Sequence, residues 1–295
     1  MNVALAVDIG GTKLAAGLVD RRGEVIVRRS VATPRGQDAE VLWDALAGLV
    51  TGVLAAPEGG AAPSVCGVGC GGPMAPGGEA VSPLNIPAWR DFPLRRRLRD
   101  LVGLPVYVDN DAKALALGEG WAGAARGVGD YIAMVVSTGV GGGIVLDGRL
   151  LDGAGGNAGH IGHVIVEPGG RTCGCGAQGC LEAEASGTAI AAATGAPPAE
   201  AGEDVRRRTG TLVGRAVASV ANLLDLRLAV VAGSVALGFG EPFFAAAQAE
   251  IDARCRIEFA RGTRIVPAGL GDAGPLVGAA AVGWRNLGRP IGIRA

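Results

Sequence analysis

Short apolar runs separated by polar, glycine-containing turns fill the first third of the chain. Three of them follow one another too closely for a helix to fit between: 3–7, 14–19 and 25–27. They predict three strands in an antiparallel meander, not the strand–helix start of a Rossmann unit. Beyond the meander, helical periodicity alternates with short buried apolar runs, which is typical of an α/β domain. The expected helices and strands there are 38–55, 65–69, 94–101 and 106–108.

A similar pattern returns in the second half of the chain. A strand at 131–136, the glycine-rich run 137–143 and a strand at 144–146 resemble the opening strand–turn–strand segment. This doubling predicts two related domains. A periodic helix is expected at 211–224, a strand at 228–232, and a small-residue helix at 274–284 that returns to the first domain. We therefore expect a first domain over 1–111, completed by a helix at about 276–295, and a second domain over 112–275.

Composition narrows the class of protein. Of the 295 residues 49% are hydrophobic, and 27 basic residues are balanced by 28 acidic ones. This balance argues against nucleic acid as a partner, and no uninterrupted apolar stretch is long enough to span a membrane. The chain opens without a leader-like segment, and its six cysteines do not form a disulfide framework. We expect a cytoplasmic protein.

Both histidines of the chain and half of its cysteines lie between residues 160 and 180. They are His160, His163, Cys173, Cys175 and Cys180. Soft ligands this close together, with glycines that let the backbone turn between them, are typical of a tetrahedral zinc site. The alternative is a set of reduced core cysteines beside an incidental surface histidine.

Two glycine-rich turns are candidate phosphate-binding segments. One is DIGGTK at 8–13 and the other is STGVGGG at 137–143. Backbone N–H groups in such turns can bind phosphate, and each turn carries a threonine hydroxyl. Neither turn has the Walker pattern, and a single glycine turn of this kind is usually only a tight turn. Two of them with threonines, beside an aspartate and a lysine in a two-domain chain, favour phosphate binding.

A third segment, VYVDNDAK at 106–113, places polar residues where a strand ends and a helix begins. Side chains at the carboxyl end of such a strand face the ligand crevice of an α/β sheet. Asp111 could there accept the proton of an attacking hydroxyl. Taken alone, this segment favours Asp111 as the N-cap of the helix that follows.

Together these motifs resemble the ROK family of sugar kinases and repressors. The matching segments are 8–13, 110–112, 137–143, 162–163, the three clustered cysteines and 181–182. The resemblance extends from residue 3 to about residue 285. It implies an α/β, actin-like and hexokinase-like (ribonuclease H-like) two-domain ATPase fold with a zinc-binding loop, which binds ATP in a cleft.

The resemblance also implies roles for individual residues, and Asp111 matches the catalytic base. The positions that match sugar contacts are Gly72, Asn85, Asn110, Asp111, His163 and Glu182. Those that match structural Zn²⁺ ligands are His163, Cys173, Cys175 and Cys180. We expect ATP and Mg²⁺ at Asp8, Gly10, Gly11, Thr12, Lys13, Thr138, Gly139, Gly141, Gly233 and Ser234.

His160 departs from the family pattern, because most of its sugar kinases carry a glutamate there. That glutamate accepts hydrogen bonds from hydroxyls near C1 and C2 of the sugar, whereas an imidazole is bulkier and can donate as well as accept. The segment AGHIGH at 158–163 instead resembles the bacterial N-acetylmannosamine kinases of the family. We therefore expect phosphorylation of the 6-hydroxyl of N-acetylmannosamine, with glucose as the alternative substrate and His160 as a specificity residue.

Two alternatives to a kinase are a transcriptional repressor, a class that the family contains, and a sugar sensor without catalytic activity. Repressors carry a winged helix-turn-helix before the first glycine turn, and here Asp8 is only the eighth residue. A sugar sensor without activity would be expected to lack Asp111 or one phosphate-binding turn, and this chain has all three. The expected partner is a small-molecule sugar, and the expected assembly is a homodimer or homotetramer.

Overall fold

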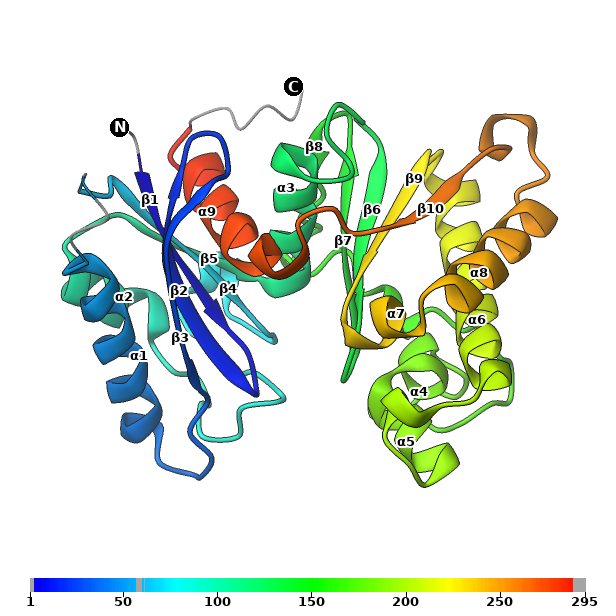
Figure 1. Ribbon diagram of the computed structural model, residues 1–295, viewed down its shortest axis with the longest axis horizontal. Helices are drawn as coiled ribbons and strands as arrows, with labels where there is room; N and C mark the ends of the chain where they lie inside the picture. Colours follow the sequence, from blue (N-terminus) through cyan, green and yellow to red (C-terminus); the bar gives the residue numbers. More distant parts are fainter. Residues whose placement is uncertain (1–2, 57–59, 61, 289–295) are drawn as a thin grey trace. The chain divides into compact units, whose positions relative to one another are not determined.

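The structure is a computed structural model that describes residues 3–56, 60 and 62–288. It divides into two compact units (Figure 1). The first extends to Arg126 and resumes at Leu270, and the second is the continuous segment Gly127–Gly269. Each unit contains one five-stranded sheet.

Unit 1 begins with the meander that the sequence predicts. Its strands are β1 (Val3–Ile9), β2 (Lys13–Asp20), β3 (Val25–Ala32), β4 (Val65–Cys70) and β5 (Val106–Asn110). They lie in the order β3-β2-β1-β4-β5; β1, β2 and β3 pair antiparallel, and β4 and β5 extend the sheet in parallel. Its helices are α1 (Ala39–Leu54), α2 (Leu94–Val102), α3 (Asp111–Ala122) and α9 (Gly274–Asn286).

Helix α9 packs so closely on the sheet of unit 1 that its backbone contacts the backbone of β4. A Cβ atom added at Gly67 of β4 would lie 1.9 Å from the carbonyl oxygen of Ala279, so only glycine fits at this position. Gly278 of α9 meets α3 in the same way, because its Cβ would lie 2.5 Å from the carbonyl oxygen of Ala114. In the structure the chain returns to unit 1 through α9, while residues 289–295 of the expected helix lie outside the described residues.

Unit 2 repeats the sheet plan of unit 1. Its strands are β6 (Tyr131–Val136), β7 (Val140–Leu146), β8 (Arg149–Leu150), β9 (Leu228–Ala232) and β10 (Arg264–Pro267). The order is β10-β9-β6-β7-β8, with an antiparallel hairpin β6–β7 and parallel strands β9 and β10. Its helices are α4 (Leu181–Ala185), α5 (Gly187–Thr194), α6 (Glu203–Leu224), α7 (Ser234–Phe239) and α8 (Glu241–Arg254). The predicted doubling of one pattern is thus present as two sheets of the same order.

The expected boundary between the units is wrong in position. We predicted that the first domain ends at residue 111 and that the second covers 112–275. Helix α3 instead belongs to unit 1, because it packs against β4 and α9. Gly118 allows this packing, since its Cβ would lie only 3.0 Å from the backbone of Gly278.

The second glycine-rich run also differs from its prediction. We expected all of 137–143 to form a turn before a strand at 144–146. Strand β7 begins at Val140, and its glycines Gly141, Gly142 and Gly143 pair with β6 across the ladder. The turn is confined to 137–139. Glycine is needed in the strand because the segment around residues 159–162 packs on it; a Cβ at Gly142 would lie 3.0 Å from the carbonyl oxygen of Gly159.

Within the part of the chain that the structure describes, the helices are too short or too polar to cross a bilayer.

Candidate active site and metal centre

The predicted residues of unit 1 gather at the carboxyl ends of three neighbouring strands. Parallel pairing aligns Ile9 of β1 with Cys70 of β4, and Cys70 with Asn110 of β5. The residues that follow these three positions therefore leave the sheet at one edge. They are the turn at 10–12, the segment Gly71–Gly72 and Asp111.

The first glycine turn is tight, and hydrogen bonds from Thr33 hold it in place. The Gly10 N–H donates to the Lys13 carbonyl over 3.0 Å. Thr33, just past β3, braces the turn on both sides: its hydroxyl donates to the Gly10 carbonyl over 2.6 Å and its N–H donates to the Thr12 carbonyl over 3.1 Å. Thr33 is not among the predicted site residues, because no local pattern distinguishes it from other strand-end threonines.

Asn85 lies against the backbone at this edge. A Cβ at Gly11 would lie 3.0 Å from Asn85 Nδ2, and one at Gly71 would lie 3.4 Å from Asn85 Oδ1. A Cβ at Gly72 would lie 3.8 Å from Asn110 Nδ2. The structure therefore brings Gly11, Gly72, Asn85 and Asn110 together, as a shared ligand site requires.

Asn110, not Asp111, is the N-cap of α3. The Asn110 side-chain oxygen accepts from the Ala112 N–H over 3.0 Å, and its backbone is extended. Asp111 is the first residue of the helix, is exposed, and accepts from the same N–H over 2.8 Å through Oδ1. Because Asn110 already caps the helix, the capping role does not account for an aspartate at position 111.

The pKa of Asp8 lies well above the ordinary value of an aspartate. Burial, and after it the negative charge of Asp111, raise the pKa of Asp8 to about 7, while Lys13 and Arg28 oppose the shift. Asp8 and Asp111 are thus close enough to repel one another. A pair of carboxylates in this state favours a cation, which suits oxygen ligation of Mg²⁺.

In unit 2 the turn at 137–139 is fixed by the starts of three helices. Glu182 of α4 accepts from the Val140 N–H over 2.9 Å, next to Gly139. Thr188 of α5 donates from its hydroxyl to the Thr138 carbonyl over 3.0 Å, and Ser137 Oγ lies 3.0 Å from Ser234 Oγ at the start of α7.

Two further predicted positions of unit 2 have mainly backbone functions. Gly233 has φ of +102°, and its Cβ would lie 2.3 Å from the Val136 carbonyl oxygen, so only glycine lets β9 turn into α7 here. Gly141 lies inside β7 opposite Val135 and not in the turn. The structure therefore brings Thr138, Gly139, Glu182 and Ser234 to one place and assigns Gly141 to the sheet.

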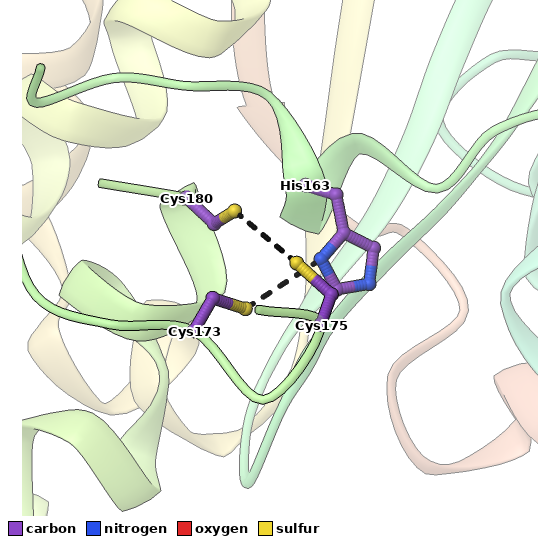
Figure 2. A group of neighbouring side chains, drawn as sticks. All are labelled: His163, Cys173, Cys175 and Cys180. Atoms are coloured by element: carbon purple, nitrogen blue, oxygen red, sulfur yellow. Dashed lines mark hydrogen bonds between the residues drawn. The ribbon is translucent and has the colours of Figure 1, made fainter. Parts of the chain in front are cut away.

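The four predicted zinc ligands form one cluster (Figure 2). Their ligand atoms lie within 4.8 Å of one another. Cys175 Sγ and Cys180 Sγ are 3.7 Å apart, and so are Cys173 Sγ and His163 Nδ1. Tetrahedral bonds of about 2.3 Å to sulfur and about 2.0 Å to nitrogen give separations of about 3.5–3.8 Å. The ligand types and spacings fit Zn²⁺, and we call residues 163–180 the zinc loop.

The cluster also defines which ring nitrogen of His163 faces a metal. The Nδ1 atom points toward the sulfur atoms (Figure 2). A neutral imidazole that ligates through Nδ1 carries its proton on Nε2. His163, which is exposed, would therefore present an N–H donor on its other side.

The Nε2 atom of His160 has the opposite hydrogen-bonding character to the Nε2 atom of His163. Its Nδ1 lies 2.7 Å from the Asn157 carbonyl oxygen, which only accepts, so Nδ1 carries the proton. Neutral His160 then holds its lone pair on Nε2. The rings of His160 and His163 lie nearly parallel, at 11° and 6.3 Å between centroids. His160 thus keeps the acceptor character of the glutamate it replaces, while its second nitrogen is already occupied.

An antiparallel hairpin continued by parallel strands occurs in both units, with polar residues at the carboxyl ends of the parallel strands. This duplicated plan defines the hexokinase-like class of α/β ATPases. The chain belongs to the ROK family, whose pattern matches residues 4–285.

Comparison with known proteins identifies close relatives. The chain is 39% identical to the N-acetylmannosamine kinase of Escherichia fergusonii over 251 residues, which cover 80% of this chain and 84% of that protein. It is 40% identical to the N-acetylmannosamine kinase of Shigella flexneri over 253 residues, with the same coverage.

Two solved structures are similar over nearly the whole chain. The ROK hexokinase of Thermus thermophilus is 33% identical, with a TM-score of 0.82 and coverage of 97% of this chain and 99% of that one. The ROK family glucokinase of Streptomyces griseus, solved with glucose and AMPPNP, is also 33% identical, with a TM-score of 0.81 and coverage of 96% and 100%.

The raised pKa of Asp8 predicts a pH-dependent stability. A folded pKa of about 7, above the ordinary 3.8, means that the folded state holds the proton more tightly. The resulting stabilisation is complete below about pH 3.8 and is lost as the pH rises through about 7. We expect Asp8→Asn to melt about 2–4 °C higher than the wild type at pH 8 and near it at pH 4, by calorimetry without nucleotide or Mg²⁺. Exposed Asp44→Asn should show no such difference, and an equal effect of Asp8→Asn at both pH values would contradict the prediction.

The ligand cluster predicts about one zinc atom per chain. Cys175→Ala removes one thiolate, so we expect the purified variant to lose most of its zinc by elemental analysis and its sugar KM to rise. His160→Ala is the matched control, because it removes the other histidine and leaves all four ligands in place. Zinc loss in the control but not in Cys175→Ala would show that the ligand set is wrong.

Proposed function

We propose that this chain is an ATP-dependent sugar kinase that transfers the γ-phosphoryl group of ATP to the 6-hydroxyl of N-acetylmannosamine. The observation that carries the sugar assignment is the identity of about 40% to N-acetylmannosamine kinases over four-fifths of the chain. Glucose is the second candidate substrate, supported by the more distant glucokinase that was solved with glucose.

In this proposal Asp111 is the catalytic base. Its position at the carboxyl end of β5 and the first turn of α3 supports the role, as does the hydrogen bond from Ala112, which orients the carboxylate. Asp111 would accept the proton of the 6-hydroxyl as its oxygen attacks phosphorus. Most of the rate enhancement in phosphoryl transfer comes from positioning and charge neutralisation, so the base must be held in place.

The nucleotide is assigned to the two glycine turns and the start of α7. The exposed hydroxyl groups of Thr12 and Thr138 and the half-buried backbone at Gly10, Gly11 and Gly139 are proposed for phosphate oxygens, while Gly233 and Ser234 are proposed for the adenosine end. Lys13 supplies positive charge beside the first turn. Mg²⁺, when bound with ATP, neutralises phosphate charge, and Asp8 is proposed to place it through water.

The family resemblance assigns the sugar to Gly72, Asn85, Asn110, His160, His163 and Glu182. Opposite hydrogen-bonding polarity of the His160 and His163 Nε2 atoms supports this assignment, because neighbouring sugar hydroxyls both donate and accept. Zn²⁺, when bound, fixes the loop that presents His163. The residues Glu182 and Val140 then hold α4 against the phosphate-binding turn.

We also propose a cytoplasmic location and a homodimeric or homotetrameric assembly, as the family resemblance implies. The small-molecule sugar is the proposed partner.

Replacing the base tests the catalytic assignment. Asp111→Asn keeps the shape of the side chain but cannot accept the proton, so we expect kcat to fall by about a thousandfold or more while sugar affinity changes little. A coupled ADP-release assay gives kcat, and calorimetric sugar titration gives affinity. Asp44→Asn on α1 should behave as the wild type. A variant that keeps a tenth of wild-type kcat would remove Asp111 from the role of base.

Replacing His160 tests the sugar assignment. We expect the wild type to prefer N-acetylmannosamine over glucose by kcat/KM. His160→Glu restores the family carboxylate, and the relative preference should move toward glucose by about tenfold to a hundredfold.

Both sugars are measured in the ADP-release assay, and the zinc content of the variant is checked to show that the neighbouring cluster is intact. Preference of the wild type for glucose would overturn the N-acetylmannosamine assignment and leave the kinase assignment standing. An unchanged ratio in His160→Glu would show that His160 does not read the sugar.

A further inference from the structure

Glu184 is a buried carboxylate to which the sequence analysis gave no role. It lies in α4, two residues after Glu182 and four after the zinc ligand Cys180, and it is 2% exposed. A carboxylate removed from water in this way is costly unless its oxygens are paired.

Both oxygens of Glu184 have partners, and one partner belongs to the zinc loop. Oε1 accepts from the backbone N–H of Arg171 over 2.7 Å, two residues before Cys173. Oε2 accepts from the Arg208 side chain of α6 over 2.7 Å, and the Arg171 guanidinium lies 3.8 Å away. Burial would raise the pKa of Glu184, but the Arg171 N–H and the two guanidinium groups outweigh it and hold that pKa below its usual range.

The backbone of the zinc loop is shaped to admit this carboxylate. A Cβ at Gly170 would lie 2.5 Å from Glu184 Oε1, so the approach requires glycine there. Arg208 of α6 also donates to the Glu184 backbone carbonyl over 3.3 Å. It therefore holds both the backbone of α4 and the Glu184 side chain against α6.

The two carboxylates of α4 therefore hold different segments. Glu182 accepts from Val140 at the phosphate-binding turn, while Glu184 accepts from Arg171 inside the zinc loop, two residues before Cys173. Residues two apart on a helix point to different sides, so one short helix connects the turn and the loop.

We infer that Glu184 is a positioning residue of the zinc loop, which holds the segment leading into Cys173 in place so that the four ligands are arranged before metal binds. The inference rests on the proposed function in one respect: the expected effect on sugar KM requires that the loop present His163 to the sugar. Glu184 is 2% exposed and therefore acts through the loop and not by direct contact with a ligand. Its loss should loosen the ligand set and lower metal affinity, as the loss of groups that orient ligands does in other metal sites.

The experiment measures zinc release from the folded protein. Zinc-loaded wild type and Glu184→Gln are challenged with excess chelating dye at 20 °C, and the release rate is followed by absorbance. The amide of glutamine cannot accept from both Arg171 and Arg208, so we expect release to be about tenfold to a hundredfold faster. Sugar KM should rise, while kcat at saturating sugar and zinc stays within about twofold.

Two further variants accompany Glu184→Gln. Glu203→Gln removes an exposed carboxylate of α6 that pairs with Arg207, and it should release zinc at the wild-type rate. Arg208→Gln leaves the Arg171 hydrogen bond but removes the nearer of the two guanidinium groups that pair with Glu184, and it should give an intermediate rate. If Glu184→Gln does not fold, Arg208→Gln tests the inference by itself.

The outcomes separate a positioning role from a purely structural one. A lower melting temperature of Glu184→Gln with an unchanged zinc release rate would overturn the inference. So would a control variant, Glu203→Gln, that releases zinc as fast as Glu184→Gln. Wild-type protein that holds no zinc would overturn it together with the metal centre. Faster release from Glu184→Gln in a protein without sugar kinase activity would uphold the inference and overturn only the proposed function.

Discussion

The parallel register of β1, β4 and β5 is the constraint on which the candidate site of unit 1 depends. Ile9, Cys70 and Asn110 lie side by side across the three strands. Because of this register, the glycine turn, the Gly71–Gly72 segment and Asp111 leave the sheet together. A slip of one residue in any strand would exchange its two faces and separate Asp111 from Asp8. The repulsion between these two carboxylates is therefore a product of strand pairing and not of any local motif.

Much of this arrangement can be read from the sequence, because it follows from local pattern. Apolar runs locate β1, β4, β5, β6 and β9 within one or two residues, and the strand-end polar residues identify the edge of the sheet. The close grouping of His163 with three cysteines is likewise a local signal. The geometry of the cluster, at 3.7 Å between sulfur atoms, adds the choice of Nδ1 as the ligand atom.

The features that could not be predicted depend on contacts between distant segments. Gly141, Gly142 and Gly143 suggested a turn, but they lie in a strand because another loop packs on it. The boundary near residue 126 follows from the packing of α3 on α9, which joins residues far apart in sequence. Thr33 and Glu184 are single polar residues whose partners lie 23 and 13 positions away. No periodicity or spacing records such pairs.

The packing of α9 on Gly67 has a consequence for how the protein forms during synthesis. Unit 2 is one continuous segment, Gly127–Gly269, and it can fold as soon as it leaves the ribosome. Unit 1 cannot, because the surface of β4 that receives α9 stays uncovered until about 200 further residues have been made. The N-terminal sheet therefore emerges first but is completed last, and during that interval its apolar face is open to chaperones and to other nascent chains.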